Sequence, residues 1–169
     1  ARMQAKARED LARLFAAEGA RVAVTGRTPG KLQKTVAEIE RRGGKALPVQ
    51  CEVKSLASLQ ACVKTVVDHF GGLNILVNNA QEVPNGELFN VSDEAFETGF
   101  QSGPLATMRL MKLCHPYLKG DGSIVNLASS ATKRWDMSGY GAYAAVKDAI
   151  RQLTRAAACE WGPEGIRVN

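Results

Sequence analysis

The sequence is 169 residues long, 45% hydrophobic and 23% charged, with a formal net charge of +5 at pH 7. This size and composition predict one globular domain (1–169) with its own hydrophobic core. The basic residues are dispersed and do not cluster with aromatic residues, and no apolar run approaches the roughly 20 residues that span a bilayer. We therefore expect neither nucleic acid nor a membrane as a partner.

Short apolar segments alternate along the chain with longer amphipathic segments. Such alternation is typical of an α/β protein whose parallel sheet is covered by helices on both faces. In chain order, the pattern predicts a helix at 2–18, a strand at 21–25, a helix at 29–42, a strand at 46–53, a helix at 56–70, a strand at 73–77, a long helix at 92–118, a strand at 123–128, a helix at 141–161 and a strand at 166–169.

Several of these boundaries carry local signals. Thr28 and Pro29 are the residue types of an N-cap and a first helical residue, and Ser55 is expected to cap the next helix. Inside the long helix, Gly103 and Pro104 give a reason for a kink, because proline has no backbone N–H to donate.

The four cysteines are widely scattered, with neither pairing nor metal-ligand spacing: Cys51, Cys62, Cys114 and Cys159. We interpret them as reduced thiols of a cytoplasmic protein, three of them packed in helices or strands. The two histidines also lie far apart in the sequence, so we expect no metal site.

Tyr143 and Lys147 form the most informative pattern in the chain. Residues four apart on a helix lie on one face, one turn from each other. An ammonium group beside a phenol favours the phenolate and lowers a phenol pKa that is otherwise about 10. The pair therefore predicts a tyrosine that gives or takes a proton near neutral pH.

Five segments together resemble the short-chain dehydrogenase/reductase family over essentially the whole chain. They are LARLFAAEGARVAVTGR (11–27), LVNNA (76–80), GSIVNLASS (122–130), YAAVK (143–147) and EGIRVN (164–169). The resemblance implies an α/β, Rossmann-like doubly wound parallel sheet that lacks the first strand and the C-terminal strands. The first strand would precede residue 1, between the 21–25 and 73–77 strands. Relatives continue past Asn169 through a substrate-covering segment.

The resemblance also implies a catalytic set. Tyr143 would be the general acid or base, and Lys147 would lower its pKa and hydrogen-bond the nicotinamide ribose. A serine would orient the substrate oxygen. The strand register counted from Asn126 selects Ser129, whereas the usual distance back from the tyrosine selects Ser130. We choose Ser129, because loops absorb insertions more readily than strands.

For the cofactor, the resemblance implies NADP(H) rather than NAD(H). Arg27 follows the strand that ends near the adenosine ribose, where a carboxylate would select NAD and a guanidinium suits a phosphate. Glu52 and Val53 occupy positions near the adenine. Asn79 and Ala80, with Asn78 before them, resemble the motif at the sheet edge, and its usual final glycine is Gln81 here.

Two further positions depart from the family pattern. The glycine-rich turn would fall on residues 1–8, where Arg2, Lys6 and Arg8 stand instead of glycines. Gly103 aligns with the family's fourth catalytic residue, an asparagine, so that amide is lost. The flanking Ser102 is a weak substitute for it.

The expected function is an NADP(H)-dependent oxidoreductase that interconverts a carbonyl and a secondary alcohol on a small molecule. The alternative is a truncated or degenerate non-catalytic relative that cannot hold the dinucleotide. The resemblance further implies a homodimer or homotetramer. The apolar residues of the long helix would face either such a contact or the core: Met108, Leu110, Met111, Leu113 and Tyr117.

Overall fold

The computed structural model describes residues 2–134, 136 and 138–169, with side chains from Glu9 onward. Ala1 and the side chains of Arg2, Lys6 and Arg8, the residues expected in place of the glycine-rich turn, lie outside the described part. The backbone from Arg2 onward is helical. The chain divides into two compact units, Ala1–Gly72 and Leu73–Asn169.

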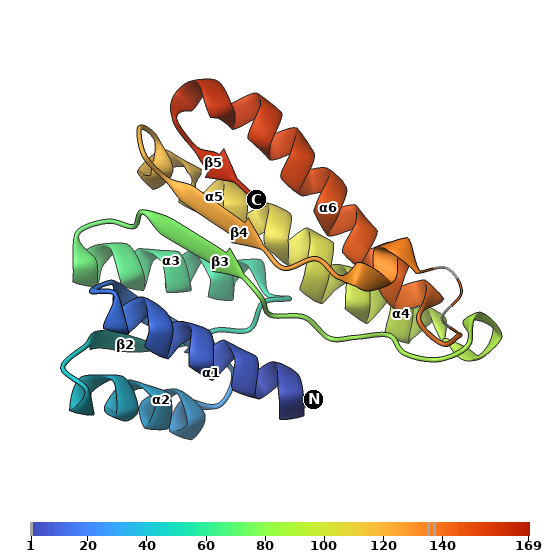
Figure 1. The fold of residues 1–169 in the computed structure, drawn as a ribbon, viewed down its shortest axis with the longest axis horizontal. Coiled ribbons are helices and arrows are strands. Elements are labelled where there is room, and N and C mark those ends of the chain that lie inside the picture. The colour runs from blue at the N-terminus through green and yellow to red at the C-terminus, as the bar shows by residue number, and fades with distance from the viewer. Residues whose placement is uncertain (1, 135, 137) are drawn as a thin grey trace. The chain divides into compact units, whose positions relative to one another are not determined.

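The first unit is a two-stranded parallel sheet with three helices. In chain order it contains α1 (Arg2–Ala17), β1 (Arg21–Gly26), α2 (Pro29–Arg41), β2 (Lys45–Gln50) and α3 (Leu56–Phe70) (Figure 1). β1 and β2 pair in parallel from Arg21 opposite Lys45 to Gly26 opposite Gln50. α1 and α2 pack on each other and on β1, and α3 packs against both strands.

Local signals mark where α2 and α3 begin. Pro29 is the first residue of α2, and the Thr28 carbonyl accepts hydrogen bonds from the N–H groups of Lys31 and Leu32. The Thr28 side chain makes no capping bond. Ser55 caps α3 as predicted, because its hydroxyl accepts from the Ser58 N–H over 3.2 Å.

The second unit is a three-stranded parallel sheet in the order β3-β4-β5. Its elements are β3 (Ile75–Asn78), η1 (Leu88–Asn90), α4 (Asp93–Phe100), η2 (Gln101–Leu105), α5 (Ala106–Leu118), β4 (Ser123–Asn126), η3 (Ser130–Lys133), α6 (Gly141–Trp161), η4 (Gly162–Glu164) and β5 (Arg167–Val168). α5 packs on β3 and β4, and α6 runs beside β4 and β5 (Figure 1).

The predicted long helix at 92–118 contains a π-helical turn. α4 and α5 continue one another through η2, where the backbone is π-helical and where Gly103 and Pro104 are both buried. Pro104 cannot donate to the preceding turn, so the regular hydrogen-bond ladder is interrupted there. The irregularity expected from Gly103 and Pro104 is thus present.

The core of the second unit lies between the sheet and the two long helices. Ile124, Val146 and Leu118 are at most 1% exposed. Three of the four thiols are buried, as predicted: Cys62 in α3, Cys114 in α5, and Cys51 one residue past the end of β2 rather than in a strand. Cys159 is exposed. In the long helix, Met111 faces the core and Tyr117 is exposed.

The predicted fold class is confirmed: the described residues form a Rossmann-like α/β fold, and the strands within each of its two sheets pair in parallel. The strands at 46–53 and 123–128 were predicted too long. β2 ends at Gln50 and β4 at Asn126, although single bonds from Cys51 N–H to the Gly26 carbonyl and from Leu127 N–H to the Asn78 carbonyl continue the pairing. None of the described helices is long and apolar enough to cross a membrane.

Candidate functional site

Lys147 lies on α6, four residues after Tyr143. Its side chain is only 6% exposed. The ammonium Nζ donates to the backbone carbonyl of Leu127, just past the end of β4, over 2.5 Å. Burial lowers the pKa of Lys147 to about 8. A buried ammonium retains three N–H donors, so two remain for other acceptors.

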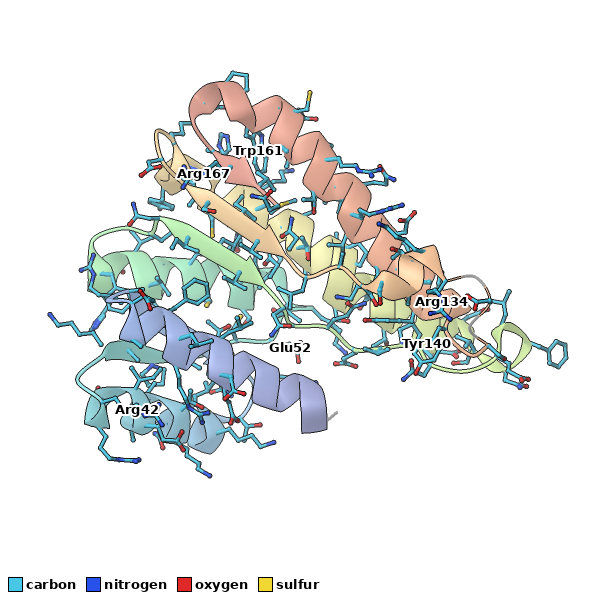
Figure 2. The ribbon with its side chains drawn as sticks, viewed as in Figure 1. Arg42, Glu52, Arg134, Tyr140, Trp161 and Arg167 are labelled. Carbon is cyan, nitrogen blue, oxygen red and sulfur yellow. The ribbon has the colours of Figure 1, made fainter. Side chains whose placement is uncertain are left out.

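Tyr143 is half-buried in the first turn of the same helix. Its ring lies 6.3 Å from the ring of Tyr140 in an edge-on arrangement. Figure 2 shows Tyr140 and Arg134 at the end of the second unit where α6 begins, and Trp161 at the opposite end of that helix. The tyrosine-lysine face therefore lies toward the carboxyl end of β4, the edge at which open α/β sheets bind ligands.

Ser129 caps the short helix η3. Its hydroxyl oxygen accepts from the Ala131 N–H over 3.2 Å. A hydroxyl that accepts one bond still has its own O–H to donate. Ser130 is the first residue of η3 and is exposed. η3 packs against α6, so the serine segment and the tyrosine helix are neighbours.

A buried network of side chains joins the strand ends to α6. The Asn78 amide donates to the Asn126 side-chain oxygen over 2.8 Å. The Asn126 amide in turn donates to the Thr154 hydroxyl on α6 over 2.9 Å. The roles of Asn126 and Thr154 were not predicted from the sequence. The available signal was that two asparagines end adjacent parallel strands.

The segment after β3 contains the predicted Asn79 and Ala80. Asn79 is half-buried and Ala80 is exposed. The following Gln81 approaches Gly103 of η2. The hydroxyl of Ser102 accepts from the Glu82 N–H over 2.9 Å and donates to the Thr98 carbonyl over 2.8 Å. Ser102 therefore fastens η2 to this segment, and we withdraw it as a substitute for the missing asparagine.

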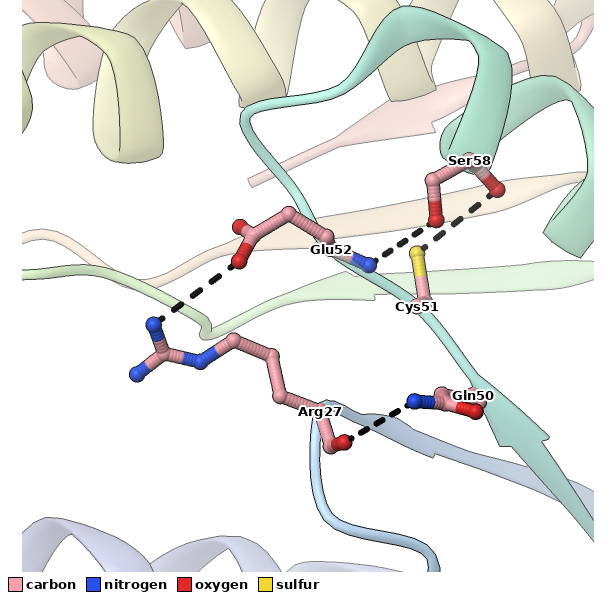
Figure 3. A pocket seen from close by; sticks show the side chains of 5 residues that line it. All are labelled: Arg27, Gln50, Cys51, Glu52 and Ser58. Carbon is pink, nitrogen blue, oxygen red and sulfur yellow. Dashed lines mark hydrogen bonds and ion pairs between the residues drawn. The ribbon is translucent and has the colours of Figure 1, made fainter.

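The first unit contains a pocket of about 410 Å³ at the carboxyl ends of its two strands. Figure 3 shows the guanidinium of Arg27 turned toward the carboxylate of Glu52, and the two are 3.7 Å apart. Both side chains remain accessible, at 63% and 38% exposure. The Gln50 side-chain amide donates to the Arg27 carbonyl over 3.2 Å. The predicted Arg27 and Glu52 are thus brought together.

The remaining pocket residues were not predicted. Five residues line the pocket, and Val53 is not one of them: Arg27, Gln50, Cys51, Glu52 and Ser58. The Ser58 hydroxyl accepts from the Glu52 N–H over 2.9 Å. Hydrogen bonding with the Cys62 thiol lowers the pKa of Cys51 to about 7. The parallel register, which sets Gly26 opposite Gln50, was the signal that could have identified Gln50 and Cys51.

No group of three or more potential metal ligands gathers anywhere in the described part of the chain. Three other features of the described residues suggest chemistry. They are a buried lysine one turn from a tyrosine, a capping serine beside that helix, and an arginine-carboxylate pocket.

Comparisons with known proteins agree on one relationship. The profile of a family described as enoyl-(acyl carrier protein) reductase matches residues 9–169. Among curated proteins, the chain is 40% identical over 162 residues to a 12α-hydroxysteroid dehydrogenase of Clostridium sp., which covers 92% of this chain and 62% of that protein.

Solved structures give the same picture. A short chain dehydrogenase from Burkholderia cenocepacia J2315, in complex with NADP, matches with a TM-score of 0.90 and 31% identity over 98% of this chain and 67% of that one. A dehydrogenase/reductase from Sinorhizobium meliloti 1021 matches with a TM-score of 0.91 and 28% identity, over 98% of this chain and 65% of that one. The chain thus spans roughly two thirds of the length of these proteins.

Proposed function

Because the chain belongs to the short-chain dehydrogenase/reductase family, we propose that it performs NADP(H)-dependent interconversion of a carbonyl group and a secondary alcohol. One observation carries this proposal: on α6, a lysine ammonium is buried one helical turn from a half-buried tyrosine. Burying an ammonium is costly, and such groups are concentrated at functional sites.

Tyr143 is the proton-transfer group in this proposal. Its phenol protonates the substrate oxygen during reduction and takes the proton back during oxidation. Negative charge develops on the phenol oxygen as the proton leaves. With a pKa of about 8, Lys147 is predominantly charged at neutral pH, and its ammonium stabilises that developing charge.

Ser129 is the proposed orienting group for the substrate oxygen. One lone pair of its hydroxyl is used by the Ala131 N–H, which fixes the oxygen and leaves the O–H to donate. Ser130 is the competing choice. Replacing each serine by alanine separates them, because only the orienting hydroxyl is needed for turnover.

The pocket in the first unit fits the phosphate-bearing end of NADP(H). The planar Arg27 guanidinium is exposed and suits bidentate binding of a phosphate, and the Glu52 carboxylate can accept hydrogen bonds from hydroxyl or amino groups. In the second unit, Asn79, Ala80 and Lys147 are proposed for the nicotinamide riboside. The nicotinamide would supply or accept the hydride. The relative solved with NADP supports this choice.

A small ketone or aldehyde, or the corresponding alcohol, is the proposed substrate, with a homodimer or homotetramer as the proposed assembly. The curated steroid dehydrogenase makes a 12-oxosteroid a sensible first compound in a substrate panel. Size-exclusion chromatography with light scattering tests the assembly independently of activity.

The first experiment is thermal unfolding of the chain with excess NADPH, with NADH as the comparison. A ligand at about 100 times its dissociation constant adds about 2.7 kcal/mol of stability. We expect NADPH to stabilise more than NADH, and the Arg27→Leu variant to lose that difference. Stabilisation by neither cofactor would favour the non-catalytic alternative.

The second experiment measures turnover with the ketone panel, followed by NADPH absorbance. Tyr143→Phe should lose turnover by a factor of roughly 10² or more and keep its stabilisation by NADPH. Retained turnover in this variant would refute the role of Tyr143.

A further inference from the structure

Cys51 and Cys62 form a pair of thiols in the first unit that the proposed mechanism does not use. Cys51 immediately follows β2, and Cys62 lies in α3. The two residues are 4% and 6% exposed, and their side chains hydrogen-bond to each other. Neither thiol is in a disulfide. Two thiols within hydrogen-bonding distance need only a small shift to be joined by a sulfur–sulfur bond.

The first turn of α3 brings the two thiols together. Figure 3 shows the sulfur of Cys51 turned toward Ser58, whose backbone carbonyl oxygen lies 3.9 Å from it. In an α-helix this carbonyl also accepts the backbone N–H of residue 62, one turn later. The Glu52 N–H donates to the Ser58 hydroxyl, so the chain after β2 is held against the same turn. Cys51 therefore faces the part of α3 that carries Cys62.

Cys51 is accessible to a small reagent because it lines the same pocket as Arg27 and Glu52. Among the described residues that line this pocket, it carries the only thiol. With 4% of its surface exposed, Cys51 is open to a molecule nearly as small as water and closed to bulky thiol reagents. A molecule that fills the pocket would cover this thiol.

The surroundings of Cys51 favour its nucleophilic form. Hydrogen bonding with Cys62 is the main cause that lowers the pKa of Cys51 to about 7, and Ser58 contributes in the same direction. Burial and the Glu52 carboxylate oppose this shift. Roughly half of a thiol with such a pKa is thiolate at neutral pH, and the thiolate is the reactive form. Cys114 differs, because burial raises its pKa to about 12.

We propose that Cys51 and Cys62 are a peroxide-reactive thiol pair, and that a ligand in the pocket of Arg27 and Glu52 protects the pair from oxidation. The pair would be oxidised to a disulfide by hydrogen peroxide and restored by a dithiol reductant. The protection rests on the proposed function, which assigns this pocket to the phosphate-bearing end of NADP(H). The thiol chemistry does not depend on that assignment.

The oxidation proceeds in two steps. The Cys51 thiolate attacks one oxygen of hydrogen peroxide, the O–O bond breaks, and the products are a sulfenic acid on Cys51 and hydroxide. The Cys62 sulfur then attacks the Cys51 sulfur, the S–O bond breaks, and the hydroxide leaves as water with the Cys62 proton. Two thiols and one peroxide thus give one disulfide and two waters. The two sulfur atoms lose the two electrons that the peroxide oxygens gain.

Peroxide treatment of the reduced wild-type chain tests the pair without any cofactor. Trypsin cleaves after lysine, so Cys51 and Cys62 end in separate peptides, 46–54 and 55–64. We expect an equimolar amount of hydrogen peroxide to link these peptides by a bond that dithiothreitol removes. Cys114 is the internal control, and the pair should be oxidised at least roughly tenfold faster. If the peptides stay unlinked, or link no faster than Cys114 is oxidised, the thiol pair is refuted.

Two variants separate the roles of the two thiols, and thermal unfolding checks that each is folded. In Cys62→Ala, the sulfenic acid on Cys51 should form more slowly, because a hydrogen bond is lost, and should persist until dimedone traps it. In Cys51→Ala, Cys62 should stay reduced, because it does not line the pocket. Oxidation of Cys62 at the wild-type rate in Cys51→Ala would overturn the assignment of Cys51 as the attacking thiol.

Protection by the cofactor tests whether the pocket controls access to the pair. NADP⁺ is the form to add, because it cannot itself reduce peroxide. At about 100 times its dissociation constant it should slow disulfide formation roughly tenfold or more, and Arg27→Leu should lose this protection. An unchanged oxidation rate in a chain that NADP⁺ stabilises against heat would overturn the protection. If NADP⁺ neither stabilises the chain nor slows oxidation, the proposed function and the protection fail together, whereas the linked peptides still establish the thiol pair.

Discussion

Asn78 and Asn126 end adjacent parallel strands in register, and the amide of the first donates to the side-chain oxygen of the second over 2.8 Å. Both side chains are buried, at 9% and 7% exposure. Asn126 passes the connection on to Thr154 of α6. The ends of β3 and β4 are therefore linked by hydrogen bonds to the helix that carries Tyr143 and Lys147. These bonds fix the position of that helix relative to the two strands.

Removing this connection should be costly. We expect Asn126→Ala to lower the free energy of unfolding by about 2–3 kcal/mol, because it leaves the Asn78 amide and the Thr154 hydroxyl without their partner in the core. Urea unfolding measures this. Asn90→Ala, at an exposed position, should stay within about 0.5 kcal/mol of wild type.

The pairing itself is tested by a double-mutant cycle. Because Asn78 and Asn126 share a hydrogen bond, Asn78→Ala combined with Asn126→Ala should cost less than the sum of the two single changes, by about 0.5–3 kcal/mol. Additive losses would mean that the two side chains contribute independently.

Lys147 should make stability depend on pH in the alkaline range. Its pKa is lowered by burial from 10.5 to about 8, so between these values the unfolded chain binds more protons than the folded chain. Stability contributed by this residue therefore rises with pH across that window, by on the order of 3 kcal/mol in total.

The comparison with Lys147→Met isolates that effect, because this variant has no proton to release at position 147. Its unfolding free energy should lack the alkaline rise seen in wild type. Lys112→Met, which changes an exposed lysine, should keep the wild-type slope. Identical slopes for wild type and Lys147→Met would show that the ammonium is well solvated in the folded chain.

Gly122 should not tolerate a side chain. A Cβ there would lie 2.5 Å from the Leu118 Cβ and closer still to the Leu118 carbonyl oxygen, so the backbone between α5 and β4 has to move. We expect Gly122→Ala to lower the unfolding free energy by about 1–3 kcal/mol. Gly141→Ala, in open space at the start of α6, should be neutral or stabilise by up to about 1 kcal/mol. Equal thermal midpoints for the two variants would contradict this.

Glu164 should make stability depend on pH in the acid range. Its carboxylate contacts Lys119 over 2.6 Å and His115 over 3.2 Å. Hydrogen bonding from Lys119 holds the pKa of Glu164 below its ordinary value. The stabilisation is therefore present above the unfolded pKa of about 4.3 and is lost as the pH falls through the lower folded value.

Thermal melts of wild type and Glu164→Gln across this range measure the Glu164 contribution. The difference between them should shrink on acidification and, since the groups are partly exposed, also with added salt. If the stability difference between wild type and Glu164→Gln does not change with pH, the contribution of Glu164 comes from packing rather than from its charge.

The regular elements could be predicted because periodicity and caps are local properties. The helix at 141–161 has the predicted ends, and Ser55 caps α3 as expected. The strands were overextended because apolar residues continue beyond the point at which the backbone leaves the ladder. Gly103 and Pro104 predicted an irregular helix, but its π-helical form depends on what packs around it.

Contacts in the candidate site could be predicted from the sequence only where the residues involved lie on one helix or strand. Tyr143 and Lys147 share a helix, so their spacing was sufficient. The pairing of Asn78 with Asn126 depends on strand register across 48 positions, and the approach of Gln81 to Gly103 depends on the path of a loop. Arg27 and Glu52 were each predicted for the cofactor, whereas their ion pair required the fold.

The buried and exposed thiols allow local unfolding of each unit to be measured by thiol modification. Cys159 is exposed and should react at once with a thiol reagent. Cys51 and Cys62 are buried in the first unit, and Cys114 is buried in the second. Their modification rates, measured by peptide mass spectrometry, would therefore report the opening rate of each unit separately. Coincident rates would indicate that the chain opens as a single cooperative body, and different rates would show which unit opens first.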